Sequence, residues 1–235
     1  MHDEIPLTGG RITQGVVKKG DYVLRPCCAN SDFVHAVLKW LESKKISAAP
    51  KFIGLTDDGR EITTFLEGTS PEDLDYFSDQ QLFRAGEIIK TLHNALSDFD
   101  GCKVGQTVCH NDLSPCNFMF MDGMPYAVFD WDTAEIGDPL NDVAYAAWMW
   151  GNIGDEDSSP ADVGKRIDAL LNGYGLGKEG QNKLIEKIHE QIQQVAKSTL
   201  EAKRTDAYEW ATHCGLWLTK HQNQIGVNWS HFATV

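Results

Sequence analysis

The segment between Val108 and Ala146 constrains this chain most, because its polar residues have a spacing that suits a shared ion. His110, Asp112 and Asn117 follow the pattern H-x-D-x-x-x-x-N, and Asp130 comes further along the same segment. Carboxylate and amide oxygens are the ligands that hard cations prefer in proteins. Whether these side chains can share one ion depends on how the sequence between them folds.

That intervening sequence predicts a β-hairpin. Two apolar, β-prone runs, 118–121 and 126–129, flank the turn sequence Asp122-Gly123-Met124-Pro125. If Asp122 faces Pro125 across the turn, Asn117 lies directly opposite Asp130, and opposed residues have Cβ atoms about 4.5–5.5 Å apart. The hairpin register therefore predicts that Asn117 and Asp130 can bind one Mg²⁺ ion together.

The predicted arrangement suits phosphoryl transfer. Asn117 and Asp130 would hold the metal, and Asp112, in the loop before the hairpin, would orient or deprotonate an acceptor hydroxyl. Asp and Asn are also common turn and cap residues, so Asp112 as a helix cap and Asp130 as a strand end explain the positions one at a time. Their joint alignment favours the catalytic interpretation.

Composition narrows the class of protein further. The 235 residues are 42% hydrophobic and 23% charged, as in folded globular proteins, and 34 acidic against 21 basic residues give a net charge of −13. Such a charge repels polyanions and argues against nucleic acid as a partner. No apolar run approaches the roughly 20 residues that cross a bilayer, so we expect a cytoplasmic chain without membrane contact. The six cysteines include no C-x-x-C pair and are expected to be reduced thiols.

The pattern of residues 1–67 predicts a small β-rich lobe with one helix. The helix is expected over 31–43, where apolar residues recur at a spacing of three to four. Short β-prone runs flank two turns that contain glycine: Ile12–Val17, Tyr22–Arg25, Phe52–Leu55 and Glu61–Leu66.

The pattern changes to helical from Gly68 onward, so residues 68–235 are expected to form a second, mostly helical lobe. Ser78 with Gln81 is a capping box that begins one helix. Ser159 followed by Pro160 is an N-cap with proline at the first helical position and begins another. The composition shift at Gly68 makes this the predicted boundary between the two domains.

The motifs HNDLSPCN, FDWD and GDPLNDVAYA together resemble the aminoglycoside phosphotransferase and choline kinase superfamily. In that superfamily, G-D-P-x-x-D-x-A follows the metal-binding aspartate; the matching residues here are Gly137, Asp138, Pro139, Asp142 and Ala144. The similarity of layout extends over residues 5–225. It implies an α+β, two-lobed protein-kinase-like fold with a nucleotide between the lobes.

The resemblance also implies a role for each matched residue. Asp112 corresponds to the catalytic base, with His110 ordering its loop. Asn117 and Asp130 correspond to the ligands of Mg²⁺, and Asp138 and Asp142 to supports of the active-site loops. The alternative, that Asp138 and Asp142 are caps on a helix that begins near Pro139, is compatible with the same role.

The small lobe departs from the kinase pattern at its phosphate-binding cation. The third strand normally carries a lysine, whereas Arg25 occupies that place here. Arginine also binds phosphate, but with a different, forked geometry. The helix at 31–43 is expected to supply a glutamate that holds this cation, yet its inward positions carry Val34 and His35.

Two further segments are predicted to contact the nucleotide. Gly10 and Arg11 lie in a glycine turn that can cover phosphates, although an ordinary turn explains them equally well. Phe65, Leu66 and Glu67 occupy the place of the interlobe hinge, whose backbone reads the base in the resembled superfamily. The donor is therefore expected to be ATP or GTP.

The acceptor is predicted to be small and cationic. Trp148, Trp150, Trp210 and Trp217 with Tyr145 are candidates for an aromatic cage, with core packing as the alternative. Asp155, Glu156 and Asp157 offer an acidic loop that suits an aminoglycoside or an amino alcohol, or simply a solvated surface. The leading prediction is a Mg²⁺-dependent small-molecule phosphotransferase; the alternatives are a kinase-fold binding or immunity protein that sequesters a toxin, and a helical regulator without a nucleotide site.

Overall fold

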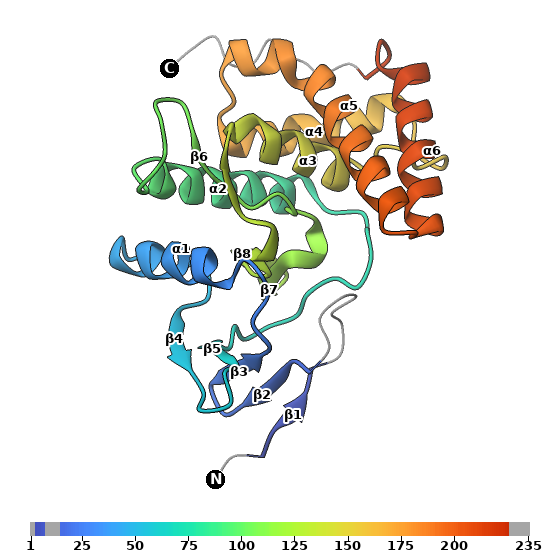
Figure 1. The fold of residues 1–235 in the computed structure, drawn as a ribbon. Helices are drawn as coiled ribbons and strands as arrows, with labels where there is room; N and C mark the ends of the chain where they lie inside the picture. The colour runs from blue at the N-terminus through green and yellow to red at the C-terminus, as the bar shows by residue number, and fades with distance from the viewer. Residues whose placement is uncertain (1–2, 8–14, 226–235) are drawn as a thin grey trace.

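The computed structural model describes residues 3–7 and 15–225, which form a small β-rich lobe and a larger helical lobe (Figure 1). The small lobe is built on one antiparallel sheet in the order β1-β2-β3-β5-β4, with helix α1 beside it. Its elements are β1 (Ile5–Pro6), β2 (Val17–Lys19), β3 (Tyr22–Arg25), α1 (Ser31–Ser43), β4 (Phe52–Leu55) and β5 (Glu61–Thr64). The predicted α+β, two-lobed fold is confirmed.

The first strand of the first hairpin ends two residues later than the sequence pattern predicts, whereas the second strand, β3, has the predicted bounds. Lys18 and Lys19 belong to β2 and pair with Val23 and Tyr22, so Gly20 and Asp21 alone form the turn. Residues 12–14 of the predicted strand lie outside the described residues. The pairing of β3 with β5 brings Arg25 opposite Glu61, two residues far apart in the chain.

Two short two-stranded antiparallel sheets lie along the chain between α2 (Asp79–Leu96) and α3 (Pro139–Gly151). One pairs β6 (Thr107–Cys109) with β9 (Glu135–Gly137), and the other pairs β7 (Phe118–Met121) with β8 (Met124–Val128). The 3₁₀ turn η1 (Pro115–Asn117) leads into β7, and η2 (Trp131–Thr133) follows β8.

The predicted register of the β7–β8 hairpin is wrong. The turn is the two-residue pair Asp122-Gly123, and a shift between Met119 and Phe120 moves the pairing again. Pro125 has no N–H to donate to the ladder, and the Phe120 backbone instead exchanges two hydrogen bonds with Thr69. As a result Asn117 accepts a backbone bond from Phe129 (3.0 Å), so Asp130 is the next residue along instead of the opposed one.

The large lobe consists mainly of five helices among the described residues: α2 (Asp79–Leu96), α3 (Pro139–Gly151), α4 (Pro160–Tyr174), α5 (Lys178–Glu201) and α6 (Thr205–His221). The Ser78–Gln81 capping box and the Ser159 cap are both present, as predicted. Helix α3 is apolar nearly all round, with Trp148 and Trp150 buried among the other helices. The segment after Gly151 ends the helix with Asn152 in a left-handed conformation.

Helices α2 and α4 touch through their backbones. A Cβ atom added to Gly86 would lie 2.1 Å from the Leu170 carbonyl oxygen, and one added to Gly173 would lie 1.8 Å from that of Phe83. Any side chain at either position would therefore push the two helices apart.

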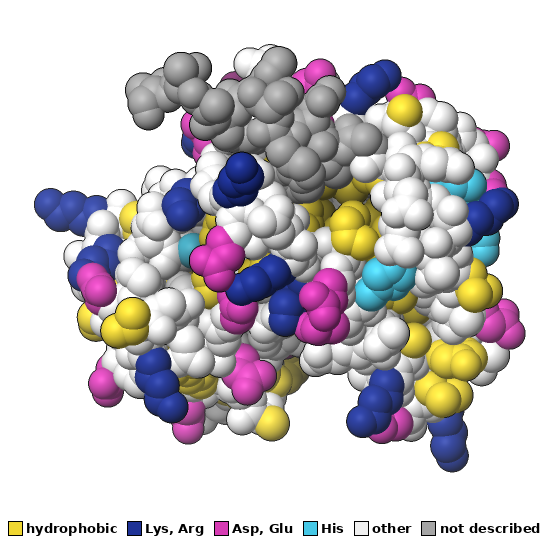
Figure 2. Space-filling model, turned by 90° about the horizontal axis from the view of Figure 1, so that it is seen from above, with side chains coloured by type: hydrophobic (Ala, Val, Ile, Leu, Met, Phe, Trp, Pro, Cys, Tyr) yellow, Lys and Arg dark blue, Asp and Glu magenta, His cyan; other side chains and the backbone are white. Residues whose placement is uncertain are grey.

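The surface seen from the large-lobe side carries acidic and basic groups interspersed with apolar ones (Figure 2). On this face, the excess negative charge is not gathered into a single patch. Among the described residues, none of the helices combines the length and apolarity required to cross a membrane.

Candidate active site

The loop between β6 and β7 carries three of the residues predicted to act in catalysis. Asn117 donates from its amide nitrogen to the Asp112 backbone carbonyl (2.9 Å), which leaves its amide oxygen as the atom available to a cation. His110 contacts its own loop and the segment after β8: Nδ1 accepts from the Asp112 N–H (3.3 Å), and Nε2 lies 3.0 Å from the Phe129 carbonyl oxygen. His110 is buried against Trp131, and its predicted role in ordering the loop stays a prediction.

Asp142, on α3, holds the same loop from behind. Its buried carboxylate accepts the backbone N–H groups of His110 and Asn111, both at 2.7 Å, and its Oδ2 lies 3.0 Å from His93 Nε2. Asp138 caps α3 by accepting the Leu140 N–H (2.9 Å). Asp142 is therefore hydrogen-bonded to the loop and Asp138 to the first turn of α3, while their support of an active site stays a prediction.

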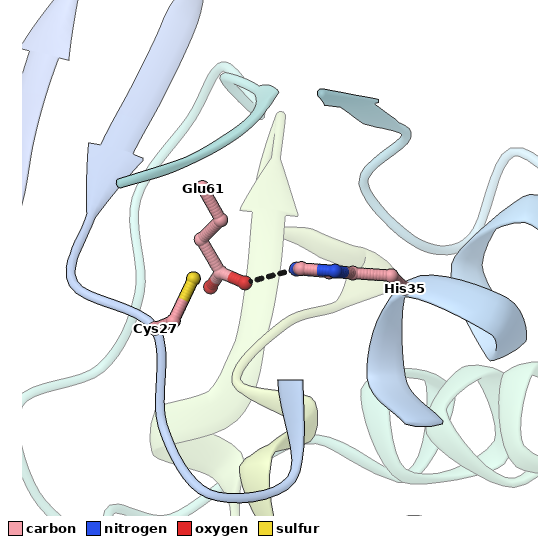
Figure 3. Close-up of side chains that lie close together, drawn as sticks. All are labelled: Cys27, His35 and Glu61. Atoms are coloured by element: carbon pink, nitrogen blue, oxygen red, sulfur yellow. Dashed lines mark hydrogen bonds and ion pairs between the residues drawn. The ribbon is translucent and has the colours of Figure 1, made fainter. Parts of the chain in front are cut away.

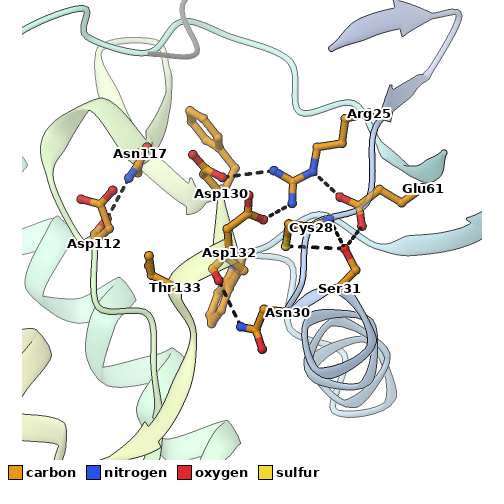
Figure 4. A network of polar contacts seen from close by, with 12 residues as sticks. Arg25, Cys28, Asn30, Ser31, Glu61, Asp112, Asn117, Asp130, Asp132 and Thr133 are labelled. Atoms are coloured by element: carbon orange, nitrogen blue, oxygen red, sulfur yellow. Dashed lines mark hydrogen bonds and ion pairs between the residues drawn. The ribbon is translucent and has the colours of Figure 1, made fainter. Parts of the chain in front are cut away.

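Arg25 contacts three carboxylates, of which Asp130 and Asp132 belong to the segment after β8 and Glu61 to the small lobe itself. Its Nε pairs with Glu61, one terminal nitrogen lies 3.1 Å from Asp130 Oδ1, and the other pairs with Asp132 (Figure 4). The expected helical glutamate is replaced by Glu61 from β5, with His35 of α1 behind it at 2.6 Å. The sequence pattern missed Glu61 and Asp132, although pairing of the strands at 22–25 and 61–66 would have placed Glu61 beside Arg25.

The electrostatics of this cluster favour a permanently charged arginine. Burial opposes the charge, but Asp132 and Glu61 together raise the pKa of Arg25 above its ordinary value. Although 43% of the Asp130 side chain is exposed, desolvation raises the pKa of its carboxyl group, the Asp132 charge adds to this, and Arg25 opposes it. Asp130 itself sits in the left-handed region, with φ of 64°, a conformation that aspartate tolerates better than most residues.

The residues predicted at the hinge lie between the small lobe and the β7–β8 hairpin. Phe65 donates its N–H to the Asp21 carbonyl (2.8 Å), and Lys18 lies over its ring, 3.5 Å from the centroid. Glu67 accepts the Tyr126 hydroxyl at its backbone oxygen (2.7 Å), and Leu66 lies between them. Gly10 and Arg11 lie outside the described residues, so their predicted contact with phosphate stays a prediction.

The four tryptophans do not form a cage. Trp148, Trp150 and Trp217 are buried in the core, and only Trp210 is partly exposed, stacked on Trp148 at 5.0 Å. Core packing, the alternative use, therefore accounts for most of them. Tyr145 instead donates its hydroxyl to Asp112 Oδ1 (2.8 Å), so it belongs to the surroundings of the predicted base.

The side chains of Asp155 and Glu156 in the acidic loop contact residues of the protein itself. Asp155 accepts hydrogen bonds from the Tyr76 and Ser158 hydroxyls, both at 2.5 Å, and these bonds lower its pKa against the opposing effect of desolvation. Glu156 lies 3.4 Å from His213 of α6. This loop joins the segment before α2 to the helices of the large lobe.

The donor atoms fit a hard divalent cation. Asn117 offers an amide oxygen, and Asp130 and Asp132 offer carboxylates that now face the Arg25 guanidinium. Asn117 and Asp130, with Asp132 beside them, have the oxygen donors that Mg²⁺ prefers, and their binding of this ion stays a prediction.

Comparison with known proteins identifies the fold. Residues 100–181 match the model of the phosphotransferase enzyme family. A trifolitoxin immunity protein from Rhizobium leguminosarum bv. trifolii is 26% identical, over 96% of this chain and 98% of its own length.

Solved structures with the same fold include nucleotide-bound kinases. The GDP complex of an aminoglycoside 2'-phosphotransferase-IIIa has a TM-score of 0.62 at 13% identity, over 95% of this chain and 94% of its own. A choline/ethanolamine kinase family protein from Mesorhizobium loti has a TM-score of 0.60 at 14% identity, over 96% and 92% of the two chains. The chain therefore has the protein-kinase-like fold of these structures, and its segment 100–181 is similar to the phosphotransferase enzyme family.

Proposed function

We propose that this protein is a Mg²⁺-dependent small-molecule phosphotransferase. It moves the terminal phosphoryl group of ATP or GTP to a hydroxyl of a small cationic acceptor such as an aminoglycoside or amino alcohol. The observation that carries the proposal is the set of contacts joining Asp112 to Asn117, and Asp130 to Arg25, on facing sides of the interlobe site. The family match over residues 100–181, which includes Asp112, Asn117 and Asp130, supports it.

Each residue has a distinct task in this proposal. Asp112 accepts the proton of the acceptor hydroxyl, which makes that oxygen a better nucleophile. Arg25 binds phosphate oxygens from the small lobe, and the backbone of Phe65, Leu66 and Glu67 contacts the base. Asn117 and Asp130 would hold Mg²⁺, which would neutralise negative charge on the phosphates. His110, Asp138 and Asp142 keep the loop in position.

Nucleotide binding is the first test. Mg²⁺-ATP or Mg²⁺-GTP at a hundred times its Kd should add about 2.7 kcal/mol to the free energy of unfolding, which a thermal-shift assay measures. Asp130→Ala should lose this shift, and Asp112→Asn should keep it while turnover falls by several orders of magnitude. Asp98→Asn, an exposed acid in the loop after α2, is the matched control. Retained turnover in the Asp112 variant would remove it from the base role.

The acceptor is to be found by measuring phosphate transfer to a panel of hydroxyl compounds. The panel comprises aminoglycosides, choline, ethanolamine, sugars and homoserine-like alcohols. We expect transfer to a cationic member, because the chain has an excess of thirteen acidic charges.

A second candidate function is supported by a specific observation. The similar protein from Rhizobium is named as an immunity protein, and Arg25 replaces the usual lysine here. A kinase-fold protein that sequesters a toxic peptide or small molecule without catalysis would show no thermal shift with either nucleotide. That result would favour the binding function over the transferase.

A further inference from the structure

Three potential metal ligands meet in the small lobe, away from the loop that carries Asp112. They are Cys27 in the loop after β3, His35 on α1 and Glu61 on β5. One ligand atom from each, a sulfur, an imidazole nitrogen and a carboxylate oxygen, lies within 4.8 Å of the other two (Figure 3). Three separate segments of the chain thus present donors to one point.

Two of these side chains are buried and fixed in orientation. Glu61 is 2% exposed and His35 is 8% exposed, and the imidazole ring stacks on Phe52 with centroids 3.8 Å apart. His35 Nε2 lies 2.6 Å from Glu61 Oε2. A preformed pair of ligands loses little conformational entropy on binding an ion.

The two oxygens of Glu61 have different partners. Oε1 pairs with Arg25, whereas Oε2 faces His35, with the Ser31 hydroxyl 3.5 Å away. An ion bound at Oε2 therefore leaves the contact between Glu61 and Arg25 in place. The Cys27 thiol, on an exposed residue, lies 3.3 Å from the Gly59 carbonyl and faces the same carboxylate.

The combination of donors selects the kind of ion. A thiolate and an imidazole are ligands of Zn²⁺, and a carboxylate completes sets of three in zinc sites that keep a fourth position for water. Mg²⁺ and Ca²⁺ prefer oxygen ligands throughout. We propose that Cys27, His35 and Glu61 form a Zn²⁺ site, with water as the fourth ligand.

Charge and protons balance at this site. On binding, the Cys27 thiol releases its proton to solvent. The imidazole N–H of His35 moves from Nε2 to Nδ1 by exchange with solvent, so Nε2 presents a lone pair to the ion, which then lies between Nε2 and Glu61 Oε2. The thiolate and the carboxylate together neutralise the two positive charges of the ion. Zinc would then connect the loop after β3, helix α1 and strand β5, the three segments that surround Arg25.

The experiment uses the full, tag-free, reduced chain with Mg²⁺ in excess, so that oxygen-rich sites elsewhere are filled. Zn²⁺ is titrated against a chromophoric chelator, and Co²⁺ serves as a spectroscopic probe. We expect one equivalent of Zn²⁺ to bind, and Co²⁺ to give the absorption of a tetrahedral ion with a thiolate charge-transfer band.

Variants separate the proposed site from adventitious binding. Cys27→Ser should abolish the charge-transfer band and weaken Zn²⁺ binding by more than the roughly 10–100-fold that follows loss of a group merely supporting a ligand. Cys28→Ser, which changes the adjacent exposed thiol, is the matched control and should bind as the unaltered chain does. His35→Gln should weaken binding likewise, and its circular dichroism spectrum reports whether it is folded.

Three results would overturn the proposal: no stoichiometric Zn²⁺ binding, binding unchanged by Cys27→Ser, or equal loss in the Cys27 and Cys28 variants. None of these measurements involves nucleotide or phosphate transfer. Failure of the zinc site and failure of the proposed transferase are therefore distinguishable.

Discussion

Tyr145 is the side chain most directly joined to the proposed base, since its hydroxyl donates to Asp112 Oδ1 at 2.8 Å. Burial, followed by the negative charge of Asp112, raises the pKa of this phenol well above its ordinary value. The hydroxyl therefore stays protonated to higher pH than a free phenol does, and it donates to the Asp112 carboxylate.

Removal of that hydroxyl should affect turnover more than binding. A hydrogen bond to a charged group contributes about 1.5–3 kcal/mol, so Tyr145→Phe is expected to lower kcat by about tenfold or more. The KM for the nucleotide should change little, because Tyr145 contacts Asp112, which in the proposed mechanism acts on the acceptor hydroxyl. Steady-state kinetics measure both, and Tyr208→Phe on α6 is the control. A variant with full kcat would show that Asp112 is oriented by other contacts.

Asp142 connects helix α3 to the loop between β6 and β7, which lies earlier in the chain. Helix α3 begins at Pro139 because Asp138 caps it, and its first turn then carries Asp142 to the backbone of His110 and Asn111. His93 of α2 donates to, or shares a proton with, the same carboxylate at 3.0 Å. Three segments are therefore joined at one buried group.

We expect Asp142→Asn to destabilise this junction. The asparagine side chain has one oxygen and one nitrogen, so its nitrogen would face a backbone N–H or the His93 imidazole nitrogen in place of a carboxylate oxygen. A buried polar group left without a hydrogen-bond partner costs about 1–3 kcal/mol. The free energy of unfolding in urea should fall by about that amount. Asp162→Asn, an exposed residue in the first turn of α4, should stay within about 0.5 kcal/mol of the unaltered chain. Equal stability of the two variants would contradict the proposed junction.

The elements that the sequence predicts well are those with local signals. The Ser78–Gln81 and Ser159–Pro160 caps fix where α2 and α4 begin, because a cap involves only the first turn of its own helix. The β7–β8 register was mispredicted for a non-local reason: Phe120 bonds to Thr69, outside the hairpin. The position of Glu61 beside Arg25 is also non-local, because it requires β3 to pair with β5 and not with β4, which is nearer in the chain. The sequence pattern does not indicate this choice of partner.

At the scale of the whole molecule, Arg25 and Asn30 link the small lobe to the segment after β8. Arg25 pairs with Asp130 and Asp132, and Asn30 donates to the backbone oxygens of Asp132 (3.1 Å) and Ala134 (3.0 Å). The two lobes are therefore joined by hydrogen bonds and ion pairs close to the proposed site of phosphoryl transfer.

Arg25→Lys tests this junction. A single ammonium group cannot pair with Glu61, Asp130 and Asp132 at once, because it lacks the planar fork of a guanidinium. We expect the free energy of unfolding to fall by about 1–3 kcal/mol and the thermal shift with nucleotide to become smaller. Urea unfolding at low salt measures the first effect, with the surface variant Arg84→Lys as its control. An unaltered free energy of unfolding would mean that the three ion pairs contribute nothing net.

The close approach at Gly86 and Gly173 has a consequence for how this molecule can move. At these two positions the backbones of α2 and α4 are in direct contact, with no layer of side chains between them. Sliding of one helix along the other would bring backbone atoms into collision, so we expect α2 and α4 to move together as one rigid body. We therefore expect any opening that admits a substrate to bend the stretch between Phe65 and Ser78, while the interior of the large lobe keeps its shape.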